Sequence, residues 1–175
     1  MDSRRIWCLG CCIFLLAGLT GFAGQDNSID ISTPAFEQGK SIPVKYAEKG
    51  ENVSPGLRIG TVPTNTRSLV LIIDDLDAPT GIWTHWLVWN LPADTTSIPE
   101  GKLPAGAIQG KNSFGRVRYD GPVPPSGTHR YFIHIFAIDT AISLPAEADR
   151  AALDAAMKGH VLGSGVTFGV YSASL

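Results

Sequence analysis

The side chains best suited to chemistry in this chain fall into three short segments. Asp75 and Asp77 lie just before a proline turn, and His85 opens the next apolar stretch. His129 and Tyr131 follow a proline-rich turn further along the chain. Imidazole and phenol groups can donate hydrogen bonds to an anion, and imidazoles can add positive charge. These segments therefore predict a site for a small polar ligand and favour an anionic one.

Short apolar runs separated by turn clusters predict a mainly β protein around that site. The clearest strand candidates are 68–75, 85–91 and 129–138. The first is apolar on both faces, as expected of a central strand that is buried on two sides. Asp149 as N-cap and Gly159 as stop predict one helix late in the chain. Weaker strand candidates are 28–33, 42–46, 57–60 and 166–171.

Many short strands and a single late helix favour two packed antiparallel sheets. A βαβ arrangement is disfavoured because no helical spacers separate the strands. The segment 94–118 is poorly periodic, and we expect it to be an extended surface excursion.

Strand alternation sorts the candidate residues by face. Residues two apart in a strand share a side, so His129 and Tyr131 point one way. Arg130 and His134 then point the other way, and we expect Arg130 to form a structural ion pair and His134 to be a core or interface residue.

The end of the 68–75 strand places a second group of side chains. A residue before proline is biased toward extended backbone, so Asp75 and Asp77 are expected on one side if the extended form persists to Pro79. If 68–75 and 85–91 are neighbouring strands, Asp75 and His85 stand at the same end of the sheet. Loops at sheet ends are where ligand sites are usually mounted.

Size, charge and missing motifs exclude several classes of protein. The 175 residues suffice for one domain with a full core and are too few for two ordinary ones. A net charge of −2, with no basic run after Arg5, makes nucleic acid an unexpected partner. No nucleophile elbow, phosphate-cradling loop or dinucleotide fingerprint is present in the sequence. We therefore predict neither an enzyme nor a cofactor.

The first 23 residues have the pattern of a secretory signal peptide. Arg4 and Arg5 precede an apolar run over 6–22, and small residues stand at Gly21 and Ala23. We predict cleavage after Ala23, which leaves a single periplasmic or secreted domain at 24–175. All three cysteines precede the cut, so disulfides and cysteine–zinc sites are excluded for the mature domain. The alternative is an uncleaved membrane anchor, because the run approaches the ~20 residues needed to span a bilayer.

Sequence blocks around the candidate residues carry a resemblance to a known family. They are Asp-Leu-Asp-Ala-Pro (75–79), His-Trp-Leu-Val-Trp-Asn-Leu-Pro (85–92), Gly-Pro-Val-Pro-Pro-Ser-Gly-Thr-His-Arg-Tyr (121–131), Gly-Glu-Asn-Val-Ser-Pro (50–55) and Lys-Gly-His-Val-Leu (158–162). Together they resemble the phosphatidylethanolamine-binding protein (PEBP) family, and its bacterial Raf-kinase-inhibitor-like branch in particular, from about residue 31 to 171. The resemblance implies a Greek-key β-sandwich of two antiparallel sheets with one short helix near the C-terminus.

The resemblance also implies an anion-binding pocket for phosphate or a phospholipid head group. By matching position, its residues would be Asp75, His85, Pro125, His129 and Tyr131, with the backbone around Gly121. Apart from the resemblance, Asp77 at the end of the first strand and Trp83, which is expected at the pocket rim, are further candidates. The sequence departs from the family at Leu76, where proline is usual. A protein partner and a homodimer are also implied as possibilities.

Several alternatives stay open at this point. Asp75 would repel an anion on direct contact, so it either orients an imidazole or receives an ammonium group such as that of phosphoethanolamine. Asp75, His85 and His129 could instead bind a metal, although the sequence lacks a short metal-ligand spacing. The protein could also inhibit or modulate an enzyme such as a kinase or protease, or be a weak hydrolase.

Overall fold

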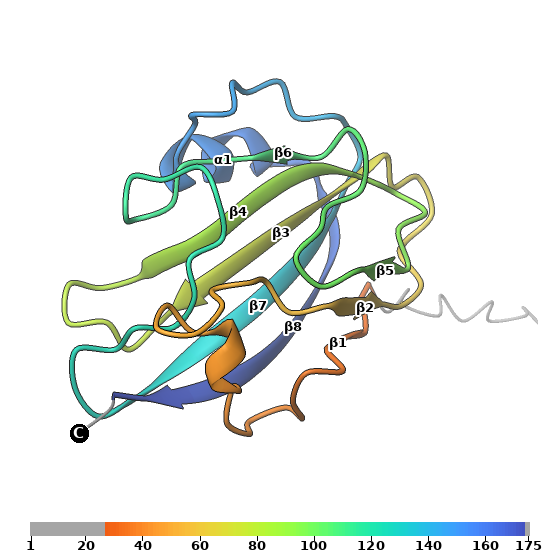
Figure 1. The fold of residues 1–175 in the computed structure, drawn as a ribbon. Helices are drawn as coiled ribbons and strands as arrows, with labels where there is room; N and C mark the ends of the chain where they lie inside the picture. The colour runs from red at the N-terminus through yellow and green to blue at the C-terminus, as the bar shows by residue number, and fades with distance from the viewer. Residues whose placement is uncertain (1–26, 174–175) are drawn as a thin grey trace, which may run out of the picture.

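The computed structural model describes residues 27–173, in which two antiparallel sheets and one α-helix are arranged as layers (Figure 1). The larger sheet has the order β6 (Ile108–Gln109), β4 (Trp83–Pro92), β3 (Ser68–Asp75), β7 (Thr128–Ile138) and β8 (Val161–Ser172). The smaller sheet has the order β1 (Ile31–Ser32), β2 (Leu57–Ile59) and β5 (Ser97–Ile98). The predicted mainly β architecture with two antiparallel sheets and one short helix is confirmed.

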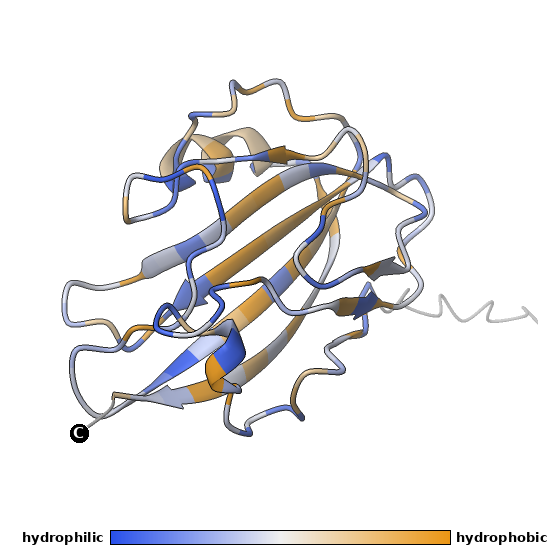
Figure 2. Ribbon diagram, viewed as in Figure 1, coloured by the Kyte–Doolittle hydropathy of each residue, from blue (hydrophilic) through white to orange (hydrophobic). Residues whose placement is uncertain are grey.

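Strand β3 is the centre of the large sheet and carries core residues on both faces. All eight of its residues are buried. Leu69, Leu71 and Ile73 pack toward the small sheet, whereas Val70 and Ile72 belong to a second cluster on the opposite face. The hydropathy colouring shows the same apolar centre in β3 and β4 (Figure 2). The two-sided apolar pattern of 68–75 therefore predicted this strand correctly.

The helix α1 (Arg150–Met157) covers part of the second face of the large sheet. The Asp149 side chain accepts a hydrogen bond from the amide of Ala152, as the predicted N-cap should. Leu153 and Met157 are the buried side chains of the helix and pack into the cluster that includes Val70 and Ile72. Gly159, with φ of 85°, follows the end of the helix.

Residues 42–46 do not form the strand that their apolar pattern predicted. They contain instead a 3₁₀ turn, η1 (Val44–Tyr46), in which the amide of Tyr46 donates to the carbonyl of Pro43. Pro43 fixes its own φ near −58° and has no amide hydrogen to donate to a neighbouring strand. Only Ser41 keeps a β-bridge, to Val170. The proline turns this segment away from the sheet.

The segment 94–118 largely follows the prediction of an irregular surface excursion. It contributes only the two-residue strands β5 and β6, one to an edge of each sheet. Strand β8 is longer than the predicted 166–171 and pairs with β7 along most of its length.

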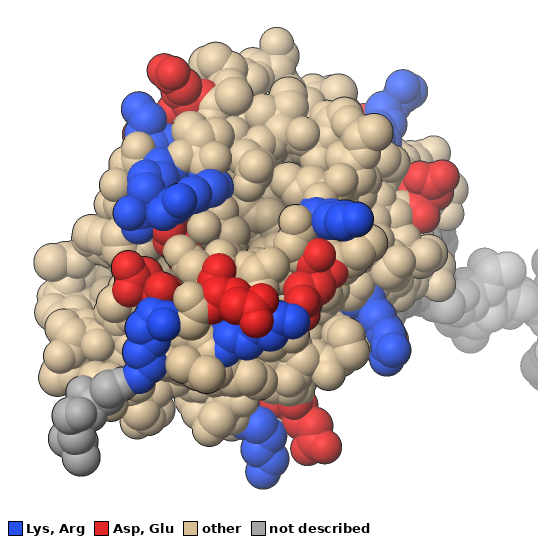
Figure 3. Space-filling model, viewed as in Figure 1, with Lys and Arg blue, Asp and Glu red and all other residues tan. Residues whose placement is uncertain are grey.

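The predicted signal peptide at 1–23, and its cleavage site, lie outside the described residues. Within 27–173, no helix is long and apolar enough to cross a membrane. On the face shown in Figure 3, lysine and arginine side chains are interspersed with aspartate and glutamate.

Candidate ligand-binding pocket at the end of the large sheet

Three strands bring the predicted site residues to one end of the large sheet. Asp75 is the last residue of β3 and is paired with Trp83 at the start of β4. On its other side Asp75 is paired with Tyr131 near the start of β7. Figure 1 shows the end of β3 and the starts of β4 and β7 at the same side of the molecule. The expected neighbourhood of Asp75 and His85 is therefore present.

A pocket of about 290 Å³ opens at this end of the sheet. Four predicted site residues line it, namely Asp75, Trp83, His85 and Pro125. Its other lining residues are Ala78, Pro79, Thr80, Phe114 and Val123. The walls are thus mainly apolar, with an imidazole and a carboxylate as the ionisable groups among the lining residues.

Asp75 is held by two hydrogen bonds from the protein. One carboxylate oxygen lies 2.7 Å from Nδ1 of His129, and the other accepts a hydrogen bond from the amide of Asp77 at 2.9 Å. Both Asp75 and His129 are buried. His129 is not among the residues that line the pocket, and it reaches the site only through its contact with Asp75.

The condition under which Asp75 and Asp77 would share a side is not met, because the extended backbone ends at Asp75. The bond from the Asp77 amide to the Asp75 side chain forms an aspartate turn, which ends the extended backbone directly after β3. Asp77 instead binds Arg130, whose Nε and terminal nitrogen donate to its two oxygens at 2.8 and 2.6 Å. These hydrogen bonds lower the pKa of Asp77 to about 2. Arg130 thus forms the predicted ion pair, and Asp77 is part of it rather than of the pocket wall.

His85 is buried between two aromatic rings and one backbone carbonyl. Its ring meets those of Phe114 and Tyr131 edge-to-face, with centroids 5.3 and 5.1 Å away. Its Nδ1 lies 2.7 Å from the carbonyl oxygen of Asp120. Burial lowers the pKa of His85, against the opposing effects of that carbonyl and of nearby carboxylates such as Asp75.

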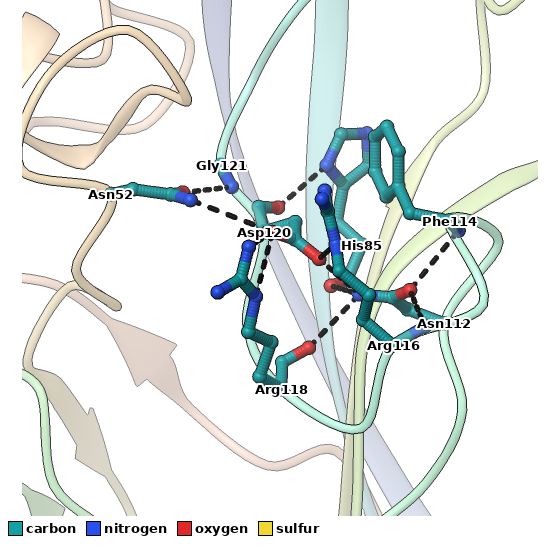
Figure 4. Close-up of polar contacts among 8 residues, drawn as sticks. All are labelled: Asn52, His85, Asn112, Phe114, Arg116, Arg118, Asp120 and Gly121. Atoms are coloured by element: carbon teal, nitrogen blue, oxygen red, sulfur yellow. Dashed lines mark hydrogen bonds and ion pairs between the residues drawn. The ribbon is translucent and has the colours of Figure 1, made fainter.

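Asp120 is the centre of a polar network that sequence reasoning missed (Figure 4). Its carboxylate is fully buried and accepts hydrogen bonds from Asn112 at 2.6 Å, Arg116 at 2.8 Å and Arg118 at 3.2 Å. Burial works to raise the pKa of Asp120, but these three donors outweigh it and hold the pKa below its usual range. The network fixes the loop whose carbonyl contacts His85.

Tyr131, another predicted site residue, is not among the residues that line the pocket. The Tyr131 ring borders a separate small cavity of about 10 Å³ that His85 also lines. Its hydroxyl is enclosed and makes no hydrogen bond within the described residues. Burial, followed by the Asp75 carboxylate, raises the pKa of this hydroxyl.

Gly121 has a packing role in this structure. A Cβ at this position would lie 2.0 Å from the carbonyl oxygen of Tyr46. Its amide donates to the side-chain oxygen of Asn52 at 2.7 Å. The Gly121 amide is therefore already bound to the protein.

Residues 27–173 contain no cluster of side chains that could bind a metal ion. No group of three histidine, cysteine, aspartate or glutamate side chains there is placed to hold one ion. Asp75 and His129 contact each other, whereas Nδ1 of His85 contacts a carbonyl.

Comparison with known proteins assigns the chain to a family. A model of the phosphatidylethanolamine-binding protein family matches residues 32–172. The chain belongs to this family. Among its relatives, the UPF0098 protein of Methanothermobacter thermautotrophicus is 44% identical over 148 residues, covering 82% of this chain and 98% of the relative. The UPF0098 protein PH1269 of Pyrococcus horikoshii is 40% identical over 168 residues, covering 91% of this chain and 84% of the relative.

Solved PEBP structures show the same fold. A putative PEBP homologue from Chlamydia trachomatis superposes with a TM-score of 0.80 at 34% identity, covering 85% of this chain and all of that one. Escherichia coli YbcL, described as a new member of the mammalian PEBP family, gives a TM-score of 0.80 at 28% identity, covering 84% and 99%. The resemblance to the PEBP family inferred from the sequence blocks is confirmed.

Proposed function

We propose that this PEBP is a binding module that holds a small anionic ligand, such as phosphate or a phosphoethanolamine-like head group, in the pocket at the end of the large sheet. The observation that carries this proposal is that Asp75 and His85 differ in how far their polar atoms are already hydrogen-bonded to the protein. Each Asp75 oxygen already accepts a hydrogen bond from the protein, whereas within residues 27–173 only one nitrogen of His85 is bound. His85 therefore offers the free polar group on the pocket wall.

The contacts of Asp75 favour an orienting role over direct recognition of an ammonium group. Its carboxylate accepts from the imidazole of His129 and from the amide of Asp77, which fixes both groups. A carboxylate that is committed in this way repels an incoming anion less than one that faces the pocket unpaired.

The apolar walls suggest that the ligand carries an organic part beside its charge. Trp83 and Phe114 meet edge-to-face with centroids 5.3 Å apart, and Pro125 is a further wall residue. The guanidinium of Arg116 lies over the Phe114 ring, 5.0 Å from its centroid. An anion attached to a short carbon chain fits such a pocket better than a large polar molecule does.

We also propose that the protein is exported, because of the sequence pattern of its first 23 residues. Expression of the full chain followed by N-terminal sequencing tests this proposal. We expect a mature protein that begins at Gly24 and is found outside the cytosol. A chain that retains residues 1–23 would refute cleavage.

Calorimetric titration with phosphate and with O-phosphoethanolamine tests the binding proposal. We expect both to bind the wild type, and we expect His85→Ala to abolish binding. His134→Ala is the matched control, because His134 lies on β7 between Phe132 and Phe136 and away from the pocket. Equal affinities in wild type and His85→Ala would reject this pocket as the site.

A further inference from the structure

The hydrogen bond to Asp120 determines which nitrogen of His85 carries a proton. A backbone carbonyl oxygen can only accept, so Nδ1 of His85 must donate across the 2.7 Å contact. A neutral imidazole has one N–H, and its other nitrogen is then an acceptor. Nε2 of neutral His85 is therefore a hydrogen-bond acceptor.

Within residues 27–173, Nε2 is the free and accessible ring nitrogen of His85. It has no hydrogen-bond partner in the described part of the chain. It is also not among the enclosed side-chain atoms of that part that lack a partner, which are Nε1 of Trp89 and the hydroxyl of Tyr131. Since His85 lines the pocket, Nε2 is the ring atom that a ligand meets.

The protein holds this tautomer in place. The amide of Asp120 donates back to the carbonyl of His85 at 3.2 Å, so the two residues are joined in both directions. Asn112 donates to the same His85 carbonyl at 3.4 Å and to the Asp120 carboxylate. Figure 4 shows the His85 ring directed at the Asp120 carbonyl, beside the other hydrogen bonds of this network. Turning the ring over would break the Nδ1 bond.

A neutral His85 is matched poorly to an anion. An acceptor nitrogen repels a fully ionised oxyanion, whereas an imidazolium donates from Nε2 and adds a positive charge. We propose that His85 takes up one proton from solvent when an anion binds, so that the pocket binds the ligand and a proton together. The Nε2 lone pair accepts that proton, and Nδ1 stays bonded to Asp120. This inference rests on the proposed anion-binding function.

The groups around His85 determine how anion affinity changes with pH. Asp75 on β3, Asp120 in the loop and Tyr131 on β7 surround it. The charges of Asp75, of Asp120 and of Asp74, whose side chain lies on the opposite face of β3 and binds Arg150, favour its charged form. Burial outweighs them and lowers the pKa of free His85. A bound anion favours the imidazolium and raises that pKa. Anion affinity is therefore constant below the free pKa and falls by up to about tenfold per pH unit between the free and bound values.

Sulfate is the sharpest probe, because its own charge is constant between about pH 5 and 8, where imidazoles titrate. Titration of the full mature domain at about neutral pH, in two buffers with different ionisation enthalpies, counts the protons taken up. We expect about one proton per sulfate in the wild type and in His134→Gln, and no proton uptake by His85→Gln, whether or not that variant still binds sulfate. Ring ¹⁵N spectra should show Nε2 of His85 changing from acceptor to donor on sulfate addition.

The possible failures are separable. Sulfate binding without proton uptake, or with the proton on His129, would overturn the inference and leave the pocket assignment intact. Binding of phosphate but not of sulfate would also overturn it, because the ligand would then supply the proton. If neither anion binds at any pH, the proposed function falls and this inference falls with it.

Discussion

Nδ1 of His129 lies 2.7 Å from a carboxylate oxygen of Asp75, and both side chains are buried where β3 and β7 pair. The second oxygen of Asp75 accepts the amide of Asp77 and so turns the chain at the end of β3. One carboxylate therefore supports both an imidazole and a loop. Asp75 shapes the pocket while its own oxygens are directed to the protein.

Asp75→Asn tests this supporting role. An amide keeps the size of the side chain but loses the charge-assisted hydrogen bond to His129. We expect a loss of about 1.5–3 kcal/mol in the free energy of unfolding. Anion affinity should weaken, but less than in His85→Ala. Denaturant unfolding and calorimetry measure the two effects. Complete loss of binding in a folded Asp75→Asn protein would show instead that Asp75 contacts the ligand.

The ion pair between Asp77 and Arg130 predicts a pH dependence of stability. Arg130 lowers the pKa of Asp77 to about 2 from an ordinary value of 3.8. A lowered carboxyl pKa stabilises the folded state above the unfolded pKa, and this stabilisation is lost as the pH falls through the folded pKa. Unfolding free energies of wild type and Asp77→Asn should therefore differ by a small amount at neutral pH, because the pair is partly exposed.

That difference should shrink below about pH 4 and vanish near pH 2. Asp94→Asn is the matched control, because Asp94 is exposed; it should match the wild type throughout. A difference between wild type and Asp77→Asn that does not change with pH would contradict the assigned ion pair. Ligand affinity should be unaffected by Asp77→Asn.

Arg150 compensates a buried charge at the far side of the sheet. It binds Asp74, whose side chain is almost fully buried and also accepts a hydrogen bond from Thr84. Arg150→Met removes the partner and leaves the Asp74 charge buried. We expect a loss of about 3 kcal/mol in denaturant unfolding. Asp154→Ala, which removes only the exposed partner of Arg150, should cost far less. Equal losses of stability in Arg150→Met and Asp154→Ala would contradict the claim that Arg150 compensates the buried charge of Asp74.

The sequence predicted the strands and the helix whose signals lie within the element itself. Strand β3 follows from apolar residues on both faces, and α1 from Asp149 and Gly159 at its ends. Residues 42–46 were assigned wrongly because their apolar alternation outweighed the effect of Pro43, which the structure shows to end the pairing.

The site was predictable only in part, because much of it depends on long-range contacts. Asp75, His85 and Pro125 could be proposed from their blocks and do line the pocket. Phe114 and Asp120 could not, since they come from the irregular segment before the proline-rich turn and reach His85 only through the fold. The Asn-x-x-x-Arg-x-Arg-x-Asp spacing from Asn112 to Asp120 was the available signal.

The chain has four histidines, and this makes one measurement especially direct. Ring signals of all four can be followed in a single NMR titration with phosphate. We predict that His85 and His129 shift, whereas His134 on the outer face of β7 and His160, bound to Asp139, do not. The two unaffected histidines control for pH and ionic strength. No shift of His85 up to millimolar phosphate, or equal shifts of all four, would contradict an anion site at the end of the large sheet.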